Sequence, residues 1–336
     1  MDDRYRAEQL AAAALAPDRA TEQREQGAFE GAFQGAFHAT MVSAASGERD
    51  RVCAVVVTRD RRELLRECLR ALRDQERLVE QVLVVDNASS DGTDAMVRED
   101  FPEAHLLSLE QNLGGAGGFH RGMAWAHAHG YEWLWLMDDD TLVRGDTLAT
   151  LLAGAARAPG GVPLVLTSQV RWKDESLHPM NAPVPRWRAR ARMAEGIAAG
   201  LLLVRYATFV STMVRREAID RFGLPLMHYF LWSDDVEFTA RVLRHSPGYL
   251  VPESVAYHWT PTPHAAATPT GDRFYYHVRN SLLLLRGSSL SPIERQDYGR
   301  YLLRSIRQYL RVNGCNRSSS LLIGRAIRDG LRGQTR

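Results

Sequence analysis

The chain has 336 residues, a hydrophobic content of 45%, a charged content of 24% and a formal net charge of +2, which are ordinary values for a globular protein. Its length is enough for one large domain or two ordinary ones. No apolar run approaches the ~18 residues of a membrane span. The acidic N-terminus lacks a secretory pattern, and the three cysteines form neither a metal pattern nor a disulfide framework. These features exclude a secreted disulfide scaffold and predict a cytoplasmic protein.

The first 48 residues differ in composition from the rest, being rich in Ala, Gln, Glu and Gly. They contain the repeat GAFEGAFQGAFH, in which Phe29, Phe33 and Phe37 are four residues apart and would share one face of a helix. We expect residues 1–48 to form a disordered or weakly helical tail. A helix that docks on a partner is the alternative.

Strand and helix patterns alternate after this tail. The run RVCAVVVT at 51–58 is continuously apolar and β-branched, which is typical of a strand buried on both faces of a parallel sheet. The segment RELLRECLRALRDQ at 62–75 has apolar residues on one helical face. Further strands are expected at 81–87, 105–110 and 132–137, and further helices within 89–100 and 115–130. The alternation predicts an α/β fold with a mostly parallel sheet.

The second half is less regular. We expect strands at 163–170, 206–214, 248–253 and 255–259, a short helix at 216–223 that Gly223 ends, and a helix at 233–246. From Gly271 the pattern becomes helical and basic. The predicted regions are therefore a tail at 1–48, an α/β domain at 49–264 and a basic helical region at 265–336.

The basic C-terminal region suggests an anionic partner. Between Arg286 and Arg336 there are eleven arginines and three acidic residues, a local charge of +8. Apolar residues at 301–310 alternate with Arg304, Arg307 and Arg311, as in a basic amphipathic helix lying on an anionic bilayer. This indicates peripheral contact with the inner face of the cell membrane. A helix packed on the α/β domain, with a solvated arginine face, is the alternative.

Polar residues follow three of the expected strands at their carboxyl ends, where open α/β sheets bind ligands. Asp138 and Asp140 follow the apolar run WLWLM and are two residues apart, so in an extended segment they point the same way. Such a pair can hold a hard divalent cation together with the oxygens of a diphosphate. A solvated acidic turn is the alternative. The other residues at these strand ends are Thr58, Arg59, Asp86 and Asn87.

The segment QNLGGAGGFHRG is rich in glycine but does not have the spacing or position of a dinucleotide-binding loop. Its glycines allow backbone N–H groups to approach a ligand, and they precede a helix whose N-terminus favours anions. Arg121 would add a charge for a phosphate. A flexible turn is the alternative. The glycines are Gly114, Gly115, Gly117 and Gly118.

Two further sites carry candidate chemistry. Asp234 and Asp235 open a helix, where one carboxylate could act as a general base while Asp234 caps the helix. His258 ends a short strand and could be the third ligand of a divalent metal. A lone histidine is more often structural.

Seven segments then occur in the order found in family 2 glycosyltransferases: VVVT, VVDNASSDGT, NLGGAGGF, LMDDDT, FVSTMVRREAIDRFG, YFLWSDDVEF and VPESVAYHW. The chain resembles that family from about Val52 to Arg286, and NLGGAGGF beside three aspartates is most similar to the galactofuranosyltransferases of actinobacterial cell-wall assembly. Rhamnosyltransferases of the same family, which use dTDP-rhamnose, are the alternative. The resemblance implies a GT-A, Rossmann-like domain at 49–264 and metal-dependent, inverting transfer from UDP-galactofuranose to a hydroxyl of a lipid-linked or cell-wall glycan.

The resemblance also implies roles for individual residues. Asp138 and Asp140 would form the DxD motif, with His258 completing the coordination of Mn²⁺ or Mg²⁺, and Asp235 would be the general base. Asp139 would contact the donor sugar or make a structural hydrogen bond. The other residues expected to bind nucleotide, sugar or acceptor are Thr58, Arg59, Asp86, Asn87, Asn112, Gly114, Gly115, Gly117, Gly118, Arg121, Trp232 and Asp234.

Two functions of other classes stay open from the residues alone. A nucleotidyltransferase also uses an α/β fold and a carboxylate pair, although the basic Gly-rich loop that often follows the first strand of such enzymes is missing here. A non-catalytic nucleotide-binding protein is the other possibility. The expected partners are a nucleoside-diphosphate sugar, a polyprenyl-linked or glycan acceptor and the membrane surface, with no nucleic acid.

Overall fold

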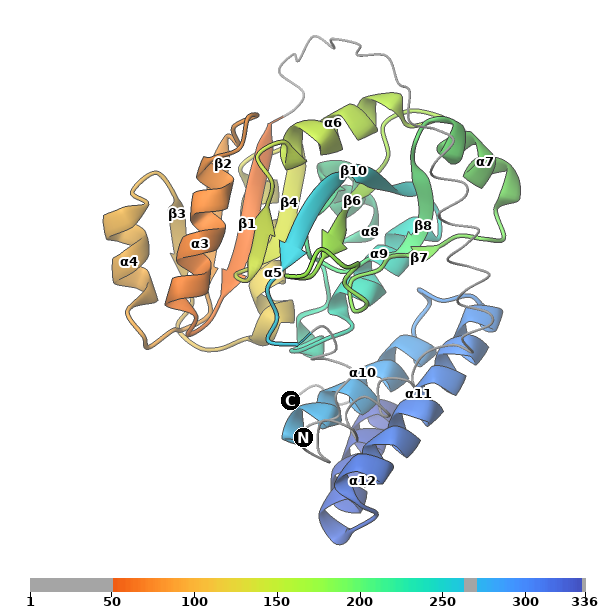
Figure 1. Cartoon of the computed structure of the whole chain (residues 1–336). Coiled ribbons are helices and arrows are strands. Elements are labelled where there is room, and N and C mark those ends of the chain that lie inside the picture. The colour runs from red at the N-terminus through yellow and green to blue at the C-terminus, as the bar shows by residue number, and fades with distance from the viewer. Residues whose placement is uncertain (1–50, 263–270, 334–336) are drawn as a thin grey trace. The chain divides into compact units, whose positions relative to one another are not determined.

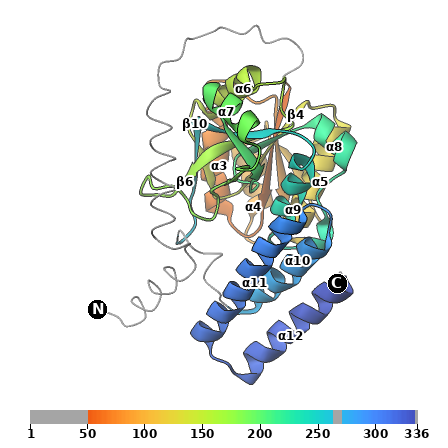
Figure 2. The same ribbon diagram turned by 90° about the vertical axis from the view of Figure 1, so that its right-hand side faces the viewer.

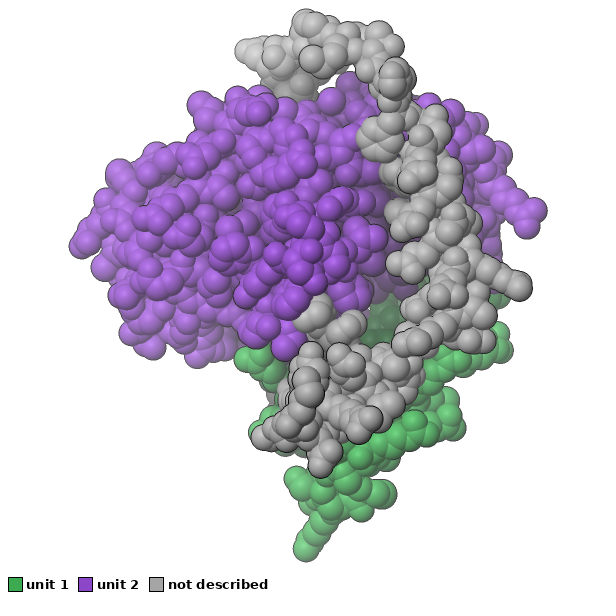
Figure 3. Space-filling view, in the orientation of Figure 1, with its two compact units in different colours: residues 1–43, 264–335 green, residues 44–263, 336 purple. Residues whose placement is uncertain are grey.

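The computed structural model describes residues 51–262 and 271–333 (Figure 1). Residues 51–262 belong to one compact unit, purple in Figure 3 and called the first unit in chain order below, and residues 271–333 belong to another, green in that figure and called the second unit. The predicted tail at 1–48, with its phenylalanine repeat, lies outside the described residues. The predicted boundary between 264 and 265 also lies outside them and stays a prediction.

The first unit is built on a mixed sheet of ten strands, in the order β3-β2-β1-β4-β9-β6-β10-β8-β7, with β5 paired to β10. The strands β3, β2, β1 and β4 run parallel, as do β6 and β10, whereas the other pairs are antiparallel. The parallel arrangement predicted for the N-terminal half is therefore confirmed. The strands are β1 Val52–Thr58, β2 Gln81–Asp86, β3 His105–Ser108, β4 Trp133–Asp138, β5 Thr141–Val143, β6 Val165–Arg171, β7 Val184–Pro185, β8 Leu202–Tyr206, β9 Thr212–Arg215 and β10 Gly248–His258.

Helices cover both faces of this sheet, as Figures 1 and 2 show. The buried side of α3 packs with Val52, Ala54 and Val56 of β1, whereas α5 lies against Val55 and Val57, which point to the opposite face. The continuously apolar β1 predicted this burial on both faces. The helices of this unit are α3 Arg62–Arg73, α4 Thr93–Asp100, α5 Gly114–Ala128, α6 Thr147–Arg157, α7 Arg190–Ala198, α8 Arg216–Phe222, the 3₁₀ helix η1 Met227–Tyr229 and α9 Asp234–Leu243.

The glycines of NLGGAGGF are not a loop that precedes a helix, because they lie within the first turns of α5. A Cβ atom on Gly118 would stand 2.4 Å from Val57 Cγ1, and one on Gly122 would stand 2.4 Å from Val55 Cγ1. Glycine at these two positions lets the helix lie directly on β1. Of the glycines in NLGGAGGF, Gly118 is therefore explained by close packing of the helix on a strand, whereas a Cβ on Gly115 would meet no atom within 4 Å.

Two strand predictions in the second half were also wrong. The segment 206–214 is not one strand: β8 ends at Tyr206, and the chain turns before β9, with Ser211 at φ 51°. The segments 248–253 and 255–259 are not two strands, because β10 runs continuously through them, with a register irregularity between Val251 and Val255. Such an irregularity accommodates Pro252, which has no N–H to donate to a ladder. The sequence patterns also missed β5, β7, α6 and α7.

The second unit contains the 3₁₀ helix η2 Gly271–Arg273 and the helices α10 Phe274–Arg286, α11 Pro292–Asn313 and α12 Arg317–Arg332. Ser291 and Glu294 form a capping box at the start of α11. Leu302 and Tyr309 of α11 are buried in a core with residues of α10 and α12, and the Tyr309 ring stacks on Phe274 at 4.1 Å. The helical prediction is confirmed, but the apolar side of α11 is covered within its own unit. None of the described helices is long and apolar enough to cross a membrane.

Candidate active site

The carboxyl ends of β1, β2 and β4 meet at one edge of the sheet. In the parallel ladders Thr58 lies opposite Asp86, and Val57 lies opposite Asp138. Asp86 is 4% exposed, and its Oδ1 accepts a hydrogen bond of 3.0 Å from the amide of Ser89. The residues that the sequence placed at three strand ends are thus brought together.

The acidic triplet bends the chain from β4 into β5. Asp138 is the last residue of β4, Asp139 and Asp140 form the turn, and Thr141 starts β5. Since β10 pairs antiparallel with β5, His258 lies opposite Thr141. Ligand atoms of Asp138, Asp140 and His258 all lie within 4.8 Å of one another. This pairing brings together the three residues that the resemblance assigned to a metal.

The chemistry of this cluster suits a divalent cation. Two carboxylates and an imidazole are ligands of Mn²⁺, and carboxylates also suit Mg²⁺. Burial and the nearby charge of Asp140 raise the pKa of Asp138 to about 7. Burial by itself would raise the pKa of Asp140 too, but its hydrogen bond to His258 and the charges of His258 and Arg61 lower it. A cation between these groups would offset the repulsion that raises the pKa of Asp138.

Asp139 points into the protein and is engaged there. Its Oδ2 accepts a hydrogen bond of 2.8 Å from the hydroxyl of Thr58, and its Oδ1 lies 3.1 Å from Arg61 Nη1. Burial raises its pKa to about 6. Of the two roles expected for Asp139, the structural hydrogen bond is the one visible in these contacts, and the same bond occupies the hydroxyl of Thr58.

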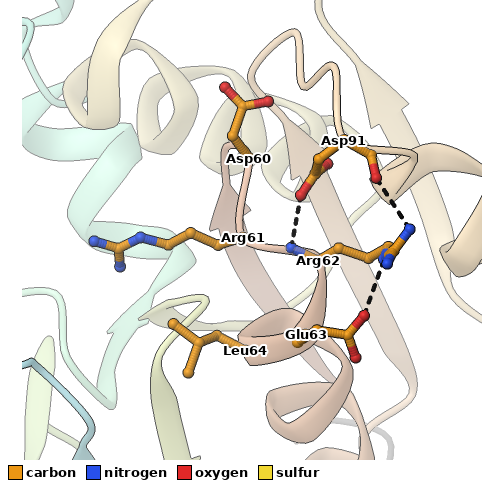
Figure 4. A pocket seen from close by; sticks show the side chains of 6 residues that line it. All are labelled: Asp60, Arg61, Arg62, Glu63, Leu64 and Asp91. Atoms are coloured by element: carbon orange, nitrogen blue, oxygen red, sulfur yellow. Dashed lines mark hydrogen bonds and ion pairs between the residues drawn. The ribbon is translucent and has the colours of Figure 1, made fainter.

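Arg61 is a site residue that the sequence reasoning missed. Its Nη1 lies 2.7 Å from Asp140 Oδ2 in addition to its contact with Asp139, so one guanidinium spans two acids of the triplet. Figure 4 shows its side chain pointing away from Asp91, whereas Arg62 is hydrogen-bonded to Asp91, and both arginines line a hollow of about 370 Å³. The available signal was the position of Arg61 just after the first strand. Arg59, which was chosen instead, pairs with Asp60 at 3.3 Å and is half exposed.

The second acidic pair stands at the start of α9. Ser233 takes the N-cap position and Asp234 follows it, so Asp234 does not cap the helix as expected. Burial and the charge of Asp235 raise the pKa of Asp234 well above its usual value, and the charge of Asp138 adds to this rise. Burial raises the pKa of Asp235 to about 6. Burial thus raises the pKa of both acids, and a pKa of about 6 lets Asp235 ionise near neutral pH, as a general base requires.

The segment before this pair has a strained backbone. Phe230, Trp232 and Ser233 have φ angles of 61°, 67° and 67°, in a region that residues other than glycine rarely adopt. The carbonyl of Phe230 accepts a hydrogen bond of 3.2 Å from the amide of Ala116 in α5. Such strain persists only where the surroundings enforce it, and it is concentrated at functional sites.

The start of α5 is tied to its neighbours by hydrogen bonds. Asn87 accepts from the amide of Leu113 at 2.8 Å and donates to the carbonyl of Gly114 at 2.7 Å. The amide of Gly114 donates to Asn112 Oδ1 at 2.8 Å. The anion site expected at this helix end stays a prediction, and Arg121 lies exposed farther along α5.

Both ring nitrogens of His258 face oxygen atoms. Nε2 lies 3.0 Å from Asp140 Oδ1, and Nδ1 lies 2.8 Å from Asn181 Oδ1. Burial by itself lowers the pKa of His258, but the hydrogen bond to Asp140 and the charges of Asp140 and Asp138 outweigh it and raise the pKa. Asn181 was not identified from the sequence, because its segment has no recognisable pattern.

The model of the family described as "Glycosyl transferase family 2" matches residues 53–223. The galactofuranosyltransferase GlfT1 of Mycolicibacterium smegmatis is 33% identical over 200 residues, which are 57% of this chain and 65% of that relative. The chain thus matches less than two thirds of the length of this relative.

Solved structures agree with the fold. The crystal structure of S. aureus TarS 1-349 in complex with UDP-GlcNAc superposes with a TM-score of 0.56 at 15% identity, covering 84% of this chain and 81% of that one. The mannosyltransferase PcManGT from Pyrobaculum calidifontis, in complex with GDP-Man and Mn²⁺, gives a TM-score of 0.52 at 19% identity, covering 97% and 92%. The chain therefore belongs to glycosyl transferase family 2 and is a glycosyltransferase with the GT-A fold.

Proposed function

We propose that this protein transfers galactofuranose from UDP-galactofuranose to a hydroxyl group of a lipid-linked or cell-wall glycan, in a metal-dependent reaction that inverts the anomeric configuration. The observation that carries the reaction type is the cluster of Asp138, Asp140 and His258, whose ligand atoms lie within 4.8 Å of one another. The similarity to GlfT1 supports the donor.

In this proposal Asp138, Asp140 and His258 hold Mn²⁺ or Mg²⁺. A bound divalent cation would supply Lewis-acid stabilisation of the negative charge that develops on the departing nucleoside diphosphate. Arg61 contacts Asp139 and Asp140, and it adds a fixed positive charge beside this site. Together these groups would assist departure of the diphosphate without a separate general acid.

Asp235 acts as the general base. Its carboxylate takes the proton of an acceptor hydroxyl while the oxygen of that hydroxyl forms a bond to the anomeric carbon of the donor. The bond between this carbon and the diphosphate oxygen breaks at the same time, and the nucleoside diphosphate leaves with the bonding electrons. Attack from the face opposite the leaving group inverts the configuration. Trp232, at the strained turn before α9, would help to shape the acceptor site.

The donor nucleotide would lie along the edge where β1, β2 and β4 end. Asp86 offers a carboxylate for the ribose or the base at this edge, beside Thr58 in the ladder. Asn87 and Asn112 would act there by fixing the start of α5. This assignment makes Asp86 the residue through which the nucleoside is recognised.

The second unit would contact the cytoplasmic face of the membrane. Arg304, Arg307 and Arg311 are exposed on α11, where Leu303 and Val312 are 56% and 52% exposed. Positive charges beside exposed apolar side chains are suited to an anionic lipid surface. A polyprenyl-linked acceptor would be embedded in such a surface.

A donor panel tests the proposal. The full chain is incubated with a polyprenyl-linked glycan acceptor and UDP-galactofuranose, dTDP-rhamnose or UDP-hexoses, each with Mn²⁺ and with EDTA. We expect release of UDP with UDP-galactofuranose and Mn²⁺ only. Turnover of dTDP-rhamnose but not of UDP-galactofuranose would show that the proposed donor is wrong. Transfer that persists in EDTA would refute the metal requirement.

A further inference from the structure

The excursion of the chain at residues 172–183, between β6 and β7, folds back onto His258. Asn181 lies in it and is only 6% exposed. Its side-chain oxygen Oδ1 is 2.8 Å from His258 Nδ1, on the side of the ring opposite the nitrogen that faces Asp140. A buried amide thus contacts the imidazole at the nitrogen that does not face Asp140.

This amide is fixed at both ends. Asn181 Nδ2 donates a hydrogen bond of 3.0 Å to Thr208 Oγ1. The backbone amide of Asn181 donates to the carbonyl of His178, and that of His178 donates to the carbonyl of Val170 in β6. The side chain of Asn181 is therefore held by the turn between β8 and β9, and its backbone is linked to β6 through His178.

The same excursion also supports the chain that follows His258. The ring centroids of His178 and His258 are 5.0 Å apart, and His178 Nε2 lies 3.0 Å from Thr260 Oγ1. The indole of Trp172 donates a hydrogen bond of 3.1 Å to the carbonyl of Thr260. The His178 ring thus packs near the His258 ring, and hydrogen bonds to Thr260 fix the chain that follows His258.

These contacts decide which nitrogen of His258 is available. An amide oxygen can only accept a hydrogen bond, so a ring nitrogen that faces it must carry hydrogen. With hydrogen fixed on Nδ1, the hydrogen that a cation would displace is the one on Nε2, which faces Asp140, and the lone pair of the neutral ring is then directed at the acids of the triplet. The reverse orientation of the amide would require Nδ1 to accept, and Nε2 would then keep its hydrogen and could not bind a metal.

We propose that Asn181 is a positioning residue that holds His258 as the Nδ1–H tautomer, with Nε2 directed at the Asp138–Asp140 pair. This inference rests on the proposed metal site and adds to it the residue that prepares the third ligand. Partners that orient ligating histidines typically change metal affinity 10- to 100-fold when they are removed.

The test measures binding of Mn²⁺ alone to the full chain, by the loss of the EPR signal of free Mn²⁺. We expect Asn181→Ala to weaken binding about 10- to 100-fold. Asn181→Asp keeps an oxygen that accepts from Nδ1 and should restore the affinity to within a few-fold of the unmodified protein. In a His258→Ala background, Asn181→Ala should have no further effect, because the group it positions is missing.

Ser254→Ala is the matched control. Ser254 is fully buried in the same strand as His258 and bonds Ser168 and the carbonyl of Thr147, but it has no described contact with the acidic cluster. Removing the Ser254 hydroxyl should lower the unfolding temperature of the protein without changing its affinity for Mn²⁺. If Asn181→Ala fails to fold, the tautomer is read in the unmodified protein from long-range ¹H–¹⁵N correlations of the imidazole, with His258→Ala for assignment. We expect hydrogen on Nδ1.

The outcomes separate two failures. If the unmodified protein and His258→Ala bind Mn²⁺ equally, or if neither binds it, the proposed metal site is wrong. If His258→Ala weakens binding but folded Asn181→Ala binds like the unmodified protein, the metal site stands and the role of Asn181 is overturned. An Nδ1 without hydrogen, or a loss in Ser254→Ala equal to that in Asn181→Ala, would overturn it as well.

Discussion

Replacement by alanine should destabilise the protein at Gly114 but not at the adjacent Gly115, although both lie at the start of α5. Gly114 has a φ of +71°, and a Cβ on it would stand 1.9 Å from the carbonyl oxygen of Phe230, a backbone atom that cannot rotate away. A side chain in this left-handed conformation costs about 1–2 kcal/mol, and overpacking costs about 1–3 kcal/mol more. Gly114→Ala should therefore destabilise the first unit by about 2–5 kcal/mol in total.

Gly115 provides the matched control, because a Cβ there would meet no atom within 4 Å. Its replacement by Ala should be neutral or stabilise the helix by up to about 1 kcal/mol. In differential scanning calorimetry, Gly114→Ala should lower the midpoint of the first unit by about 4–20 °C, given roughly 2–4 °C per kcal/mol for a unit of this size. Equal midpoints for the two variants would refute the described packing of α5 against Phe230.

Three further predictions concern charge. Because burial raises the pKa of Asp235 to about 6, kcat/KM should rise with pH through that value as the base ionises, and a profile flat between pH 5 and 7 would contradict this. Protonated Asp235 also stabilises the folded state. This stabilisation should be complete below about pH 4, where the carboxyl is protonated in the unfolded chain as well, and should be lost as the pH rises through about 6. Mn²⁺ at 100 times its Kd should stabilise the first unit by about 2.7 kcal/mol in thermal unfolding, and His258→Ala should reduce this gain at the same Mn²⁺ concentration, whereas an equal gain would exclude His258 as a ligand. Changing Arg304, Arg307 and Arg311 to Glu should abolish co-sedimentation with anionic vesicles, because each arginine near such a surface contributes about 1 kcal/mol of binding free energy. Binding of the unmodified protein to neutral vesicles would show that charge is not the cause.

The parallel core of the fold could be predicted because its signals are local. A strand buried on both faces must be continuously apolar, and β1, β2 and β4 satisfy this within their own residues. Their carboxyl ends must then share one edge of the sheet, so the sequence alone predicts Asp86 and Asp138 at that edge.

The remaining site residues depend on pairings between distant segments. His258 meets the triplet only because β10 pairs with β5, a three-residue strand with no detectable periodicity of its own. Asn181 belongs to an irregular excursion, and Arg61 differs from its arginine neighbours only in the direction of its side chain. The prediction of a glycine loop is wrong for a related reason, since composition cannot distinguish a loop before a helix from the first turns of the helix itself.

In the proposed transfer from UDP-galactofuranose, Asp235 removes the proton of the acceptor hydroxyl. The most direct measurement compares turnover by the unmodified protein and by Asp235→Asn, with Mn²⁺ and a polyprenyl-linked acceptor, alongside the UDP affinity of each. Loss of a general base should lower kcat about 10²- to 10⁴-fold while UDP affinity stays unchanged. Full turnover by Asp235→Asn would contradict the account.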